Sequence, residues 1–149
     1  MSQSTLSTPS APNRFQAVFD QIANGAIERE QNRILPYDAV DALRQSGFTA
    51  VRIPQKLGGE NLSLRETFRL LVKLAAADSN LPQIIRAHFA FVEGERQRLT
   101  ETGAEASAGK WLETIHAGAV FGAAMAELGK ATETNTTLTP KDDKWFLNG

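Results

Sequence analysis

The sequence predicts a mainly α-helical domain followed by the first strands of a β-domain. Up to about residue 117, apolar side chains recur at three- and four-residue spacing, which is typical of amphipathic helices. From residue 118 this spacing stops, and small and β-prone residues take over. Helices followed by strands, without alternation, indicate segregated α and β parts rather than βαβ units. We therefore divide the chain into a flexible tail (1–12), a helical domain (13–117) and the start of a β-domain (118–149).

Two helices are predicted before Gly47. The first spans about residues 13–33 and ends at Leu35-Pro36, because proline disfavours helical geometry in the residue before it. The second spans about Tyr37 to Gln45, and Gly47 suits the position after its C-terminus. The apolar faces are expected to contain Phe15, Val18, Phe19, Ile22 and Ala26 in the first helix, and Val40 and Leu43 in the second.

A loop and a third helix follow. Residues 48–59 are interrupted by Pro54 and two glycines, so we expect a loop that packs Phe48, Val51 and Ile53 on the core. The third helix begins at Ser63, because Ser63 and Glu66 have the spacing of a capping box. Its apolar face is expected to consist of Leu64, Phe68, Leu71, Val72 and Ala75.

Two further helices complete the helical domain. The fourth follows the polar residues 78–80, has Pro82 near its first turn, and runs to about Thr100 before Gly103. The fifth spans about Ala104 to His116. The expected apolar stripes are Leu81, Ile85, His88, Val92 and Leu99 in the fourth helix, and Trp111, Leu112 and Ile115 in the fifth.

The last part of the chain has the character of β-structure. Residues 118–127 are apolar and rich in small side chains, which favours a buried strand, and residues 134–139 are β-prone. Residues 140–143 have turn chemistry, and residues 144–147 predict the returning strand. The terminal Asn148-Gly149 pair is a hairpin-turn signal with no strand after it, so we expect the natural protein to continue.

The composition excludes several classes of protein. The net charge is −1 and both signs are spread along the chain. The chain therefore has no basic block of the kind that binds nucleic acid or an anionic membrane surface. The absence of cysteine excludes a disulfide scaffold, a thiolate nucleophile and a cysteine-ligated metal. The N-terminus lacks the features of a signal peptide, and no run approaches the roughly 20 apolar residues of a membrane span. We expect a cytoplasmic protein.

Metal and phosphate motifs are also missing. His88 and His116, the only histidines, have no partner at ligand spacing, and no carboxylate cluster has the form of a calcium loop. We therefore expect no metal site. Neither Gly58-Gly59 nor the pair Gly118 and Gly122 matches a P-loop or a dinucleotide fingerprint.

Two features are candidates for a functional site. His88 lies in the apolar stripe of the fourth helix, where it is either a core histidine with a hydrogen-bond partner or a proton donor facing a cofactor. Residues 120–127 are small enough for backbone groups to approach a flat ligand closely, although tight packing on the helices explains them equally well. Arg52 and Arg86 are possible anion binders, and the alternative for each is an ordinary solvated or paired arginine.

Four motifs now stand in order along the chain. They are Pro-x-x-x-Gly-Gly at residues 54–59, Ala-Ala-Asp-Ser-Asn at 76–80 followed by a helix with His88, Gly118-x-x-Phe-Gly-x-x-Met-Ala-Glu127, and Asp143-Lys-Trp-Phe-Leu-Asn-Gly149. In order and spacing they resemble the acyl-CoA dehydrogenase family, and the resemblance runs from about residue 14 to the end of the chain.

The resemblance implies a fold and a cofactor. Members of the family have an N-terminal helical domain, a middle β-domain and a C-terminal four-helix bundle, with flavin between the last two, usually in a homotetramer. This chain would hold the first domain and the beginning of the second, and would be inactive alone because most of the flavin site lies elsewhere. The positions that match the flavin-contacting strand are Phe121, Ala123, Met125, Ala126 and Glu127.

Departures from the family pattern point to one branch. The threonine that usually precedes the glutamate is Ala126, and the Gly-Ser-Asp that usually follows is replaced within residues 128–135. Together with Arg86-Ala-His88-Phe-x-Phe91, these changes resemble the flavin-dependent monooxygenases that include dibenzothiophene monooxygenase. Such enzymes take reduced flavin from a separate reductase and use oxygen, and the resemblance implies that His88 is catalytic, placed to hydrogen-bond near the reacting oxygen.

We therefore expect a flavin-dependent oxidoreductase that acts on a small molecule with FAD or FMN, most closely a two-component monooxygenase. The first alternative is an FAD-dependent acyl-CoA dehydrogenase. In both readings the flavin carries the redox chemistry and the protein orients it. The second alternative is a non-catalytic helical interaction module whose core mimics the pattern.

Overall fold

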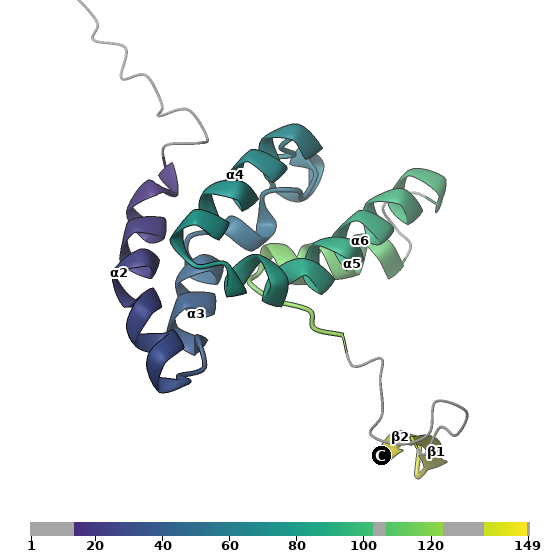
Figure 1. The fold of residues 1–149 in the computed structure, drawn as a ribbon. Coiled ribbons are helices and arrows are strands. Elements are labelled where there is room, and N and C mark those ends of the chain that lie inside the picture. Colours follow the sequence, from purple (N-terminus) through teal and green to yellow (C-terminus); the bar gives the residue numbers. More distant parts are fainter. Residues whose placement is uncertain (1–13, 103–106, 124–135, 149) are drawn as a thin grey trace, which may run out of the picture.

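The structure is a computed structural model, and it describes residues 14–102, 107–123 and 136–148. Figure 1 shows the described helices packed together as one helical domain, with a two-stranded hairpin at the C-terminal end of the chain. The elements are α2 (Gln16–Asn32), α3 (Tyr37–Gln45), the 3₁₀ turns η1 (Phe48–Ala50) and η2 (Gln55–Leu57), α4 (Leu64–Ala77), α5 (Asn80–Thr102), α6 (Ser107–His116), β1 (Thr137–Lys141) and β2 (Lys144–Asn148). The mainly helical fold with C-terminal strands is confirmed.

The first two helices lie close to their predicted bounds. Helix α2 ends at Asn32, within one residue of the predicted end, because Arg33 adopts a left-handed conformation with φ of 53°. Its N–H bonds to carbonyl groups of the last turn of α2 and so closes the helix. Helix α3 has the predicted bounds, and Gly47 after it has φ of 77°.

The loop between α3 and α4 is buried as predicted, with Phe48, Val51 and Ile53 fully enclosed. It folds back on itself, since the N–H of Leu62 donates to the Val51 carbonyl and the N–H of Asn61 donates to the Ile53 carbonyl, each at 2.9 Å. These bonds satisfy backbone groups that would otherwise be buried without partners.

The two glycines of the loop have different structural reasons. Gly58 has φ of 82°, a conformation that glycine adopts at low cost. Gly59 runs so close to the backbone of Ile53 that a Cβ atom there would overlap the Ile53 carbonyl oxygen. The Pro-x-x-x-Gly-Gly motif is therefore explained by the turn and by close backbone packing.

Helix α4 begins as predicted but buries a different face. Ser63 and Glu66 form the capping box. The predicted apolar face is wrong for Leu64, Phe68, Val72 and Ala75, which are exposed, and only Leu71 is half-buried. The buried face consists instead of Thr67, Leu70 and Leu74, because α4 carries two apolar stripes and α2 and α5 cover this one. The other stripe remains on the surface.

Helix α5 confirms its predicted stripe, and α6 confirms its stripe except at Trp111. All five predicted positions of α5 are buried, and so is Glu95, which the apolar pattern did not include. Leu112 and Ile115 of α6 are fully buried, while Trp111 remains 41% exposed.

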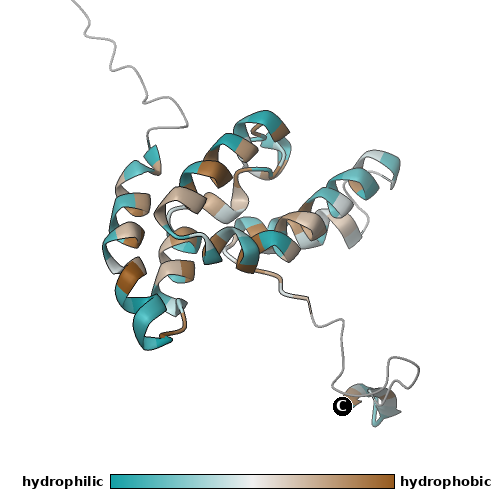
Figure 2. Cartoon of the chain, viewed as in Figure 1, coloured by the Kyte–Doolittle hydropathy of each residue, from teal (hydrophilic) through white to brown (hydrophobic). Residues whose placement is uncertain are grey.

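Two hydrophobic clusters form the core. The first joins α2, α3, α4 and the start of α5 around Phe15, Phe48 and Leu74. The second joins the later part of α5 to α6 around Val92 and Leu112. Helix α5 and the loop after α3 contribute to both clusters, so they hold the two halves of the core together. Figure 2 shows hydrophobic positions recurring along the helices between hydrophilic ones, and no described helix is long and apolar enough to cross a membrane.

The β-part differs from prediction in two places. The described residues 118–123 of the predicted buried strand form no strand, and Val120 is 37% exposed. In the hairpin, Pro140 and Lys141 belong to β1 rather than to the turn, which consists of Asp142 and Asp143 with φ of 50° and 58°. Positive φ at both central residues matches the right-handed twist of the flanking strands. The predicted returning strand is confirmed as β2.

Candidate functional site

His88 lies at the junction of the two core clusters. Along α5 it stands between Ile85 of the first cluster and Val92 of the second, and its side chain is fully buried. Its Nε2 lies 2.9 Å from the Thr49 carbonyl oxygen, and the backbone N–H of Phe121 donates to its Nδ1 at 3.2 Å. A carbonyl can only accept and an N–H can only donate, so the geometry assigns the neutral tautomer with its proton on Nε2.

The electrostatics agree with a neutral ring. Burial lowers the pKa of His88, since the charged imidazolium is poorly solvated in the core. The hydrogen bond to the Thr49 carbonyl opposes this shift without cancelling it. His88 is therefore uncharged at neutral pH and ties α5 to two distant segments, η1 on one side and the chain after α6 on the other.

The structure brings together two residues that were predicted separately. Phe121, proposed from the flavin-contacting motif, is the residue whose N–H binds His88. Its ring stacks on Phe91 with centroids 4.3 Å apart and 15° between the ring planes. Trp111 meets the Phe121 ring edge-on at 5.6 Å. Phe91 and Trp111 therefore fix the side chain of Phe121, and His88 fixes its backbone.

The rest of the predicted cofactor segment is only partly described. Ala123 is exposed, and a Cβ added at Gly122 would meet nothing within 4 Å. The backbone at Gly122 and Ala123 is therefore uncovered. Met125, Ala126 and Glu127 lie outside the described residues.

Arg52, one of the candidate anion binders, is already engaged. Its guanidinium makes two hydrogen bonds to the Glu93 carboxylate, at 2.6 and 2.7 Å, and a third to the Leu62 carbonyl. Burial and the neighbouring Arg52 lower the pKa of Arg96, while Glu93 acts in the opposite direction. These contacts make Arg52 a structural residue. Arg86 is exposed.

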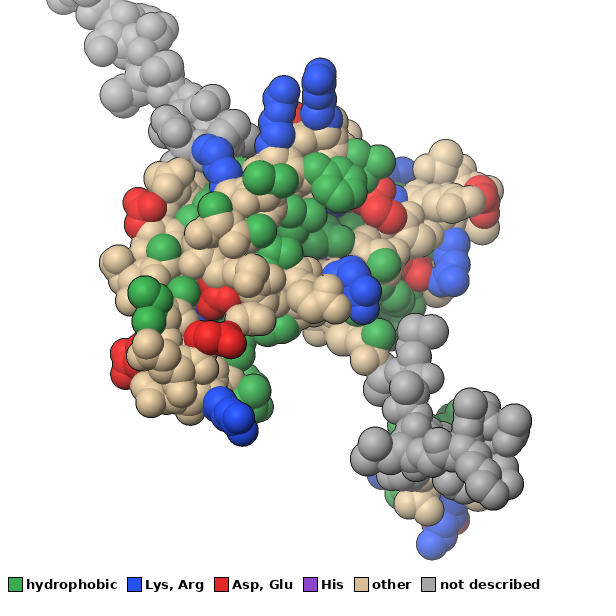
Figure 3. Space-filling model, in the orientation of Figure 1, with side chains coloured by type: hydrophobic (Ala, Val, Ile, Leu, Met, Phe, Trp, Pro, Cys, Tyr) green, Lys and Arg blue, Asp and Glu red, His purple; other side chains and the backbone are tan. Residues whose placement is uncertain are grey.

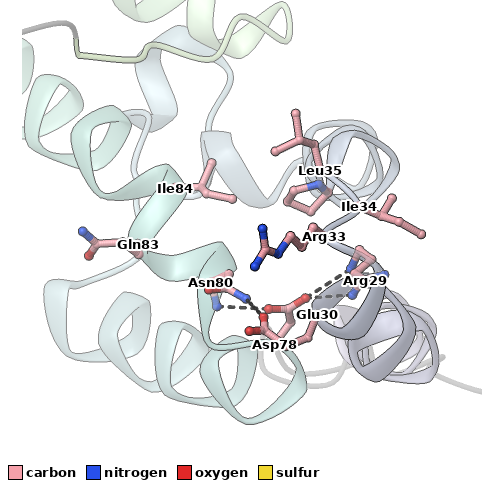
Figure 4. Close-up of a pocket in the computed structure, with 10 residues that line it drawn as sticks. Arg29, Glu30, Arg33, Ile34, Leu35, Asp78, Asn80, Gln83 and Ile84 are labelled. Atoms are coloured by element: carbon pink, nitrogen blue, oxygen red, sulfur yellow. Dashed lines mark hydrogen bonds and ion pairs between the residues drawn. The ribbon is translucent and has the colours of Figure 1, made fainter. Parts of the chain in front are cut away.

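The Ala-Ala-Asp-Ser-Asn motif also has a structural explanation. Asp78 and Asn80 line a cavity of about 370 Å³ together with the C-terminal turns of α2. Figure 4 shows both residues directly beside Arg29 and Glu30. The guanidinium of Arg29 donates to the Asp78 carboxylate at 2.8 and 3.2 Å, and Asn80 donates to Glu30 at 3.2 Å. Asp78 also accepts the backbone N–H of Asn80 at 3.0 Å. The motif thus joins the turn between α4 and α5 to α2.

Sequence reasoning missed the partners of His88 and Phe121. Thr49 contributes only a backbone carbonyl, which no side-chain pattern reveals. Phe91 and Trp111 lie on different helices, α5 and α6. Their common contact with Phe121 depends on the packing of these two helices, which the sequence pattern does not show. Among the described residues, no group of three histidine or acidic side chains is placed to hold a metal ion.

Comparisons with known proteins agree with the motifs. The sequence family described as "Acyl-CoA dehydrogenase, N-terminal domain" matches residues 15–119. The probable FMNH2-dependent monooxygenase SfnC of Pseudomonas putida is 35% identical over 68 residues, which are 46% of this chain and 17% of that protein. The putative acyl-CoA dehydrogenase YdbM of Bacillus subtilis (strain 168) is 24% identical over 145 residues, covering 89% of this chain and 35% of that protein. The matches thus span about a third or less of either relative, and no solved structure matches significantly.

Proposed function

Because this chain belongs to the acyl-CoA dehydrogenase family, we propose that its complete protein is a flavin-dependent oxidoreductase. This chain supplies the helical domain and the first strands of the β-domain. The reaction proposed is that of a two-component monooxygenase, which takes reduced flavin from a separate reductase and uses oxygen on a small-molecule substrate. The observation that supports this choice of reaction is the similarity to an FMNH2-dependent monooxygenase.

Within this proposal, the chain contributes a segment that is held in place and contacts one side of the flavin. The flavin, when bound, exchanges electrons with oxygen or with the substrate. Phe121 and Ala123, with Met125, Ala126 and Glu127 after them, would hold it along one side. His88 holds the backbone of Phe121 in place through Nδ1, and the rings of Phe91 and Trp111 pack against the Phe121 ring and hold its side chain.

The direct role of His88 is a separate part of the proposal. Both ring nitrogens are engaged in the structure, so the ring has no free N–H for the reacting oxygen. Catalysis through His88 would require the Phe121 N–H to leave Nδ1, or the Nε2 proton to leave the Thr49 carbonyl. The contacts favour His88 as a positioning residue, and its catalytic role remains a prediction.

An acyl-CoA dehydrogenase is the second candidate function. The similarity to a putative acyl-CoA dehydrogenase extends over 89% of this chain, and a fully bonded His88 suits an enzyme that needs no proton donor there. FAD rather than FMN would then be the cofactor. A homotetramer and a cytoplasmic location accompany either candidate.

Two reactions of the complete protein separate these candidates. We expect reduced FMN bound to the protein to be reoxidised on rapid mixing with oxygen, at a rate that the protein changes from that of free FMN. We expect no bleaching of oxidised protein-bound flavin by acyl-CoA thioesters under nitrogen. Bleaching by an acyl-CoA would overturn the monooxygenase proposal in favour of a dehydrogenase. Failure to bind any flavin would favour the helical interaction module.

A further inference from the structure

The apolar stripe that α4 leaves on the surface, with Leu64, Phe68 and Leu71, forms one wall of an apolar cavity. Phe68 is 62% exposed and Leu64 is 51% exposed, although both are large apolar side chains in an ordered helix. Figure 3 shows hydrophobic side chains gathered over α4 and the adjacent part of α5 on this face. Exposed apolar patches on a folded domain commonly mark binding surfaces.

Helix α5 supplies the opposite wall. Pro82, Phe89 and Ala90 face Phe68 and Leu71 across a cavity of about 290 Å³. This volume is near the lower end of the range of small-molecule sites, roughly 300–1,000 Å³. The wall is apolar apart from Thr67 and three charged side chains. The hydroxyl of Thr67 donates to the Ser63 carbonyl at 3.0 Å, so its proton is already used.

The charges around the cavity leave one positive charge uncompensated. Arg52 and Arg86 line the cavity together with a single carboxylate, Glu93. Glu93 makes two hydrogen bonds to Arg52, so that pair is neutral. Arg86 has no ion pair or side-chain hydrogen bond within the described ranges 14–102, 107–123 and 136–148. A guanidinium beside an apolar cavity favours a ligand that is apolar along its body and anionic at one end.

We infer that the cavity between α4 and α5 binds a small organic monoanion, a carboxylate or sulfonate with an apolar chain or ring. The apolar body lies between Phe68, Leu71 and Phe89, and the anionic group meets Arg86. The site is distinct from the contact between His88 and Phe121: Phe89 touches the His88 ring edge-on, with centroids 5.4 Å apart, but Arg86 and Ala90 lie on a different face of α5, and neither His88 nor Phe121 lines the cavity. The inference therefore does not rest on the proposed flavin chemistry.

Titration calorimetry of the 149-residue chain with octane-1-sulfonate, below its micelle concentration, tests this inference. Saturable binding of one molecule per chain is expected, with octan-1-ol and octyltrimethylammonium about tenfold weaker or worse because they lack the anionic group. Equal affinity for the sulfonate and the alcohol would overturn the charge argument. Sulfonate binding that does not saturate would overturn the site.

Three variants locate the site. Arg86→Gln is expected to weaken the sulfonate about tenfold and to leave the alcohol unchanged. Ala90→Trp is expected to abolish binding of both, since the new ring fills the cavity from an exposed position. Arg69→Gln is the matched control, because Arg69 is an exposed cation of α4 that does not line the cavity. Equal losses in Arg69→Gln and Arg86→Gln, or unchanged binding in Ala90→Trp, would contradict the assignment.

Sedimentation velocity tests the rival occupant, a second copy of the chain. A monomer over the concentrations used for calorimetry supports the small-ligand site. A dimer that Phe68→Ser dissociates would overturn it, since the second copy would then cover the cavity.

Discussion

The two hydrogen bonds of His88 can be separated by substitution, since asparagine and glutamine each preserve one of them. The amide oxygen of asparagine is placed like Nδ1 and can accept the N–H of Phe121. The amide nitrogen of glutamine is placed like Nε2 and can donate to the Thr49 carbonyl. His88→Asn therefore leaves the Thr49 carbonyl unpaired, and His88→Gln leaves the Phe121 N–H unpaired.

The magnitudes follow from the burial of each orphaned group. An unsatisfied buried polar group costs about 1–3 kcal/mol. Thr49 is fully buried, so His88→Asn is expected to lower the free energy of unfolding by about 2 kcal/mol. Phe121 is only half-buried, so His88→Gln is expected to cost about 1 kcal/mol. His88→Ala removes both bonds and leaves a cavity, and is expected to cost roughly 3–5 kcal/mol.

The assay combines urea unfolding with amide hydrogen exchange at Phe121. Exchange at Phe121 is expected to be fast in His88→Gln and His88→Ala and slow in His88→Asn and the wild type. A merely space-filling histidine would make exchange at Phe121 equal in the two amide variants. Unchanged protection of the Phe121 amide in His88→Gln would refute the hydrogen bond.

Further predictions concern pH, the face of α4 and the glycines of the chain. The pKa of His88 is lowered in the folded state, so the unfolded chain binds more protons, and stability is expected to fall as the pH drops below about 6.5, by at most about 1.4 kcal/mol per pH unit. Urea unfolding of the wild type against His88→Gln between pH 5 and 8 checks this, and an equal slope in both would contradict it. Leu70→Ala is expected to cost about 2–5 kcal/mol, while Phe68→Ala on the exposed stripe is expected to cost under about 1 kcal/mol; equal losses in thermal unfolding would restore the sequence-based face. Gly59→Ala is expected to cost about 3 kcal/mol or more or to prevent folding, whereas Gly94→Ala, in open space on α5, is expected to stabilise by about 0.5–1 kcal/mol; a tolerated Gly59→Ala would show that the loop relaxes.

Most of the helical framework could be predicted from the sequence. Helix α3 and the capping box of α4 were predicted at their observed positions because proline, serine and glycine have strong local preferences. The stripe of α5 was predicted because apolar side chains recur at helical spacing along one side of that helix, although Glu95 is also buried on that side. In contrast, α4 has apolar residues on two sides, and periodicity does not tell which side other helices cover. The choice between Leu70 and Phe68 is therefore made by tertiary packing.

The site was only partly accessible from the sequence. His88 and Phe121 were both identified, yet nothing in the pattern indicated that they bind each other, since they are 33 positions apart. The segment after α6 was predicted as a strand because small apolar residues suit a buried strand, but residues 118–123 pair with no other strand among the described residues. Pro140 was assigned to a turn for its local preference, although it fits β1 of a two-stranded hairpin, where proline is tolerated.

The most direct test of the central claim is the binding of flavin to the complete protein in its two redox states. The proposal predicts that reduced FMN, titrated under nitrogen, binds more tightly than oxidised FMN, and that His88→Gln weakens this binding because the Phe121 segment is released. A protein that retains oxidised FAD through purification, is bleached by an acyl-CoA and keeps its flavin in His88→Gln would contradict both the monooxygenase proposal and the positioning role of His88.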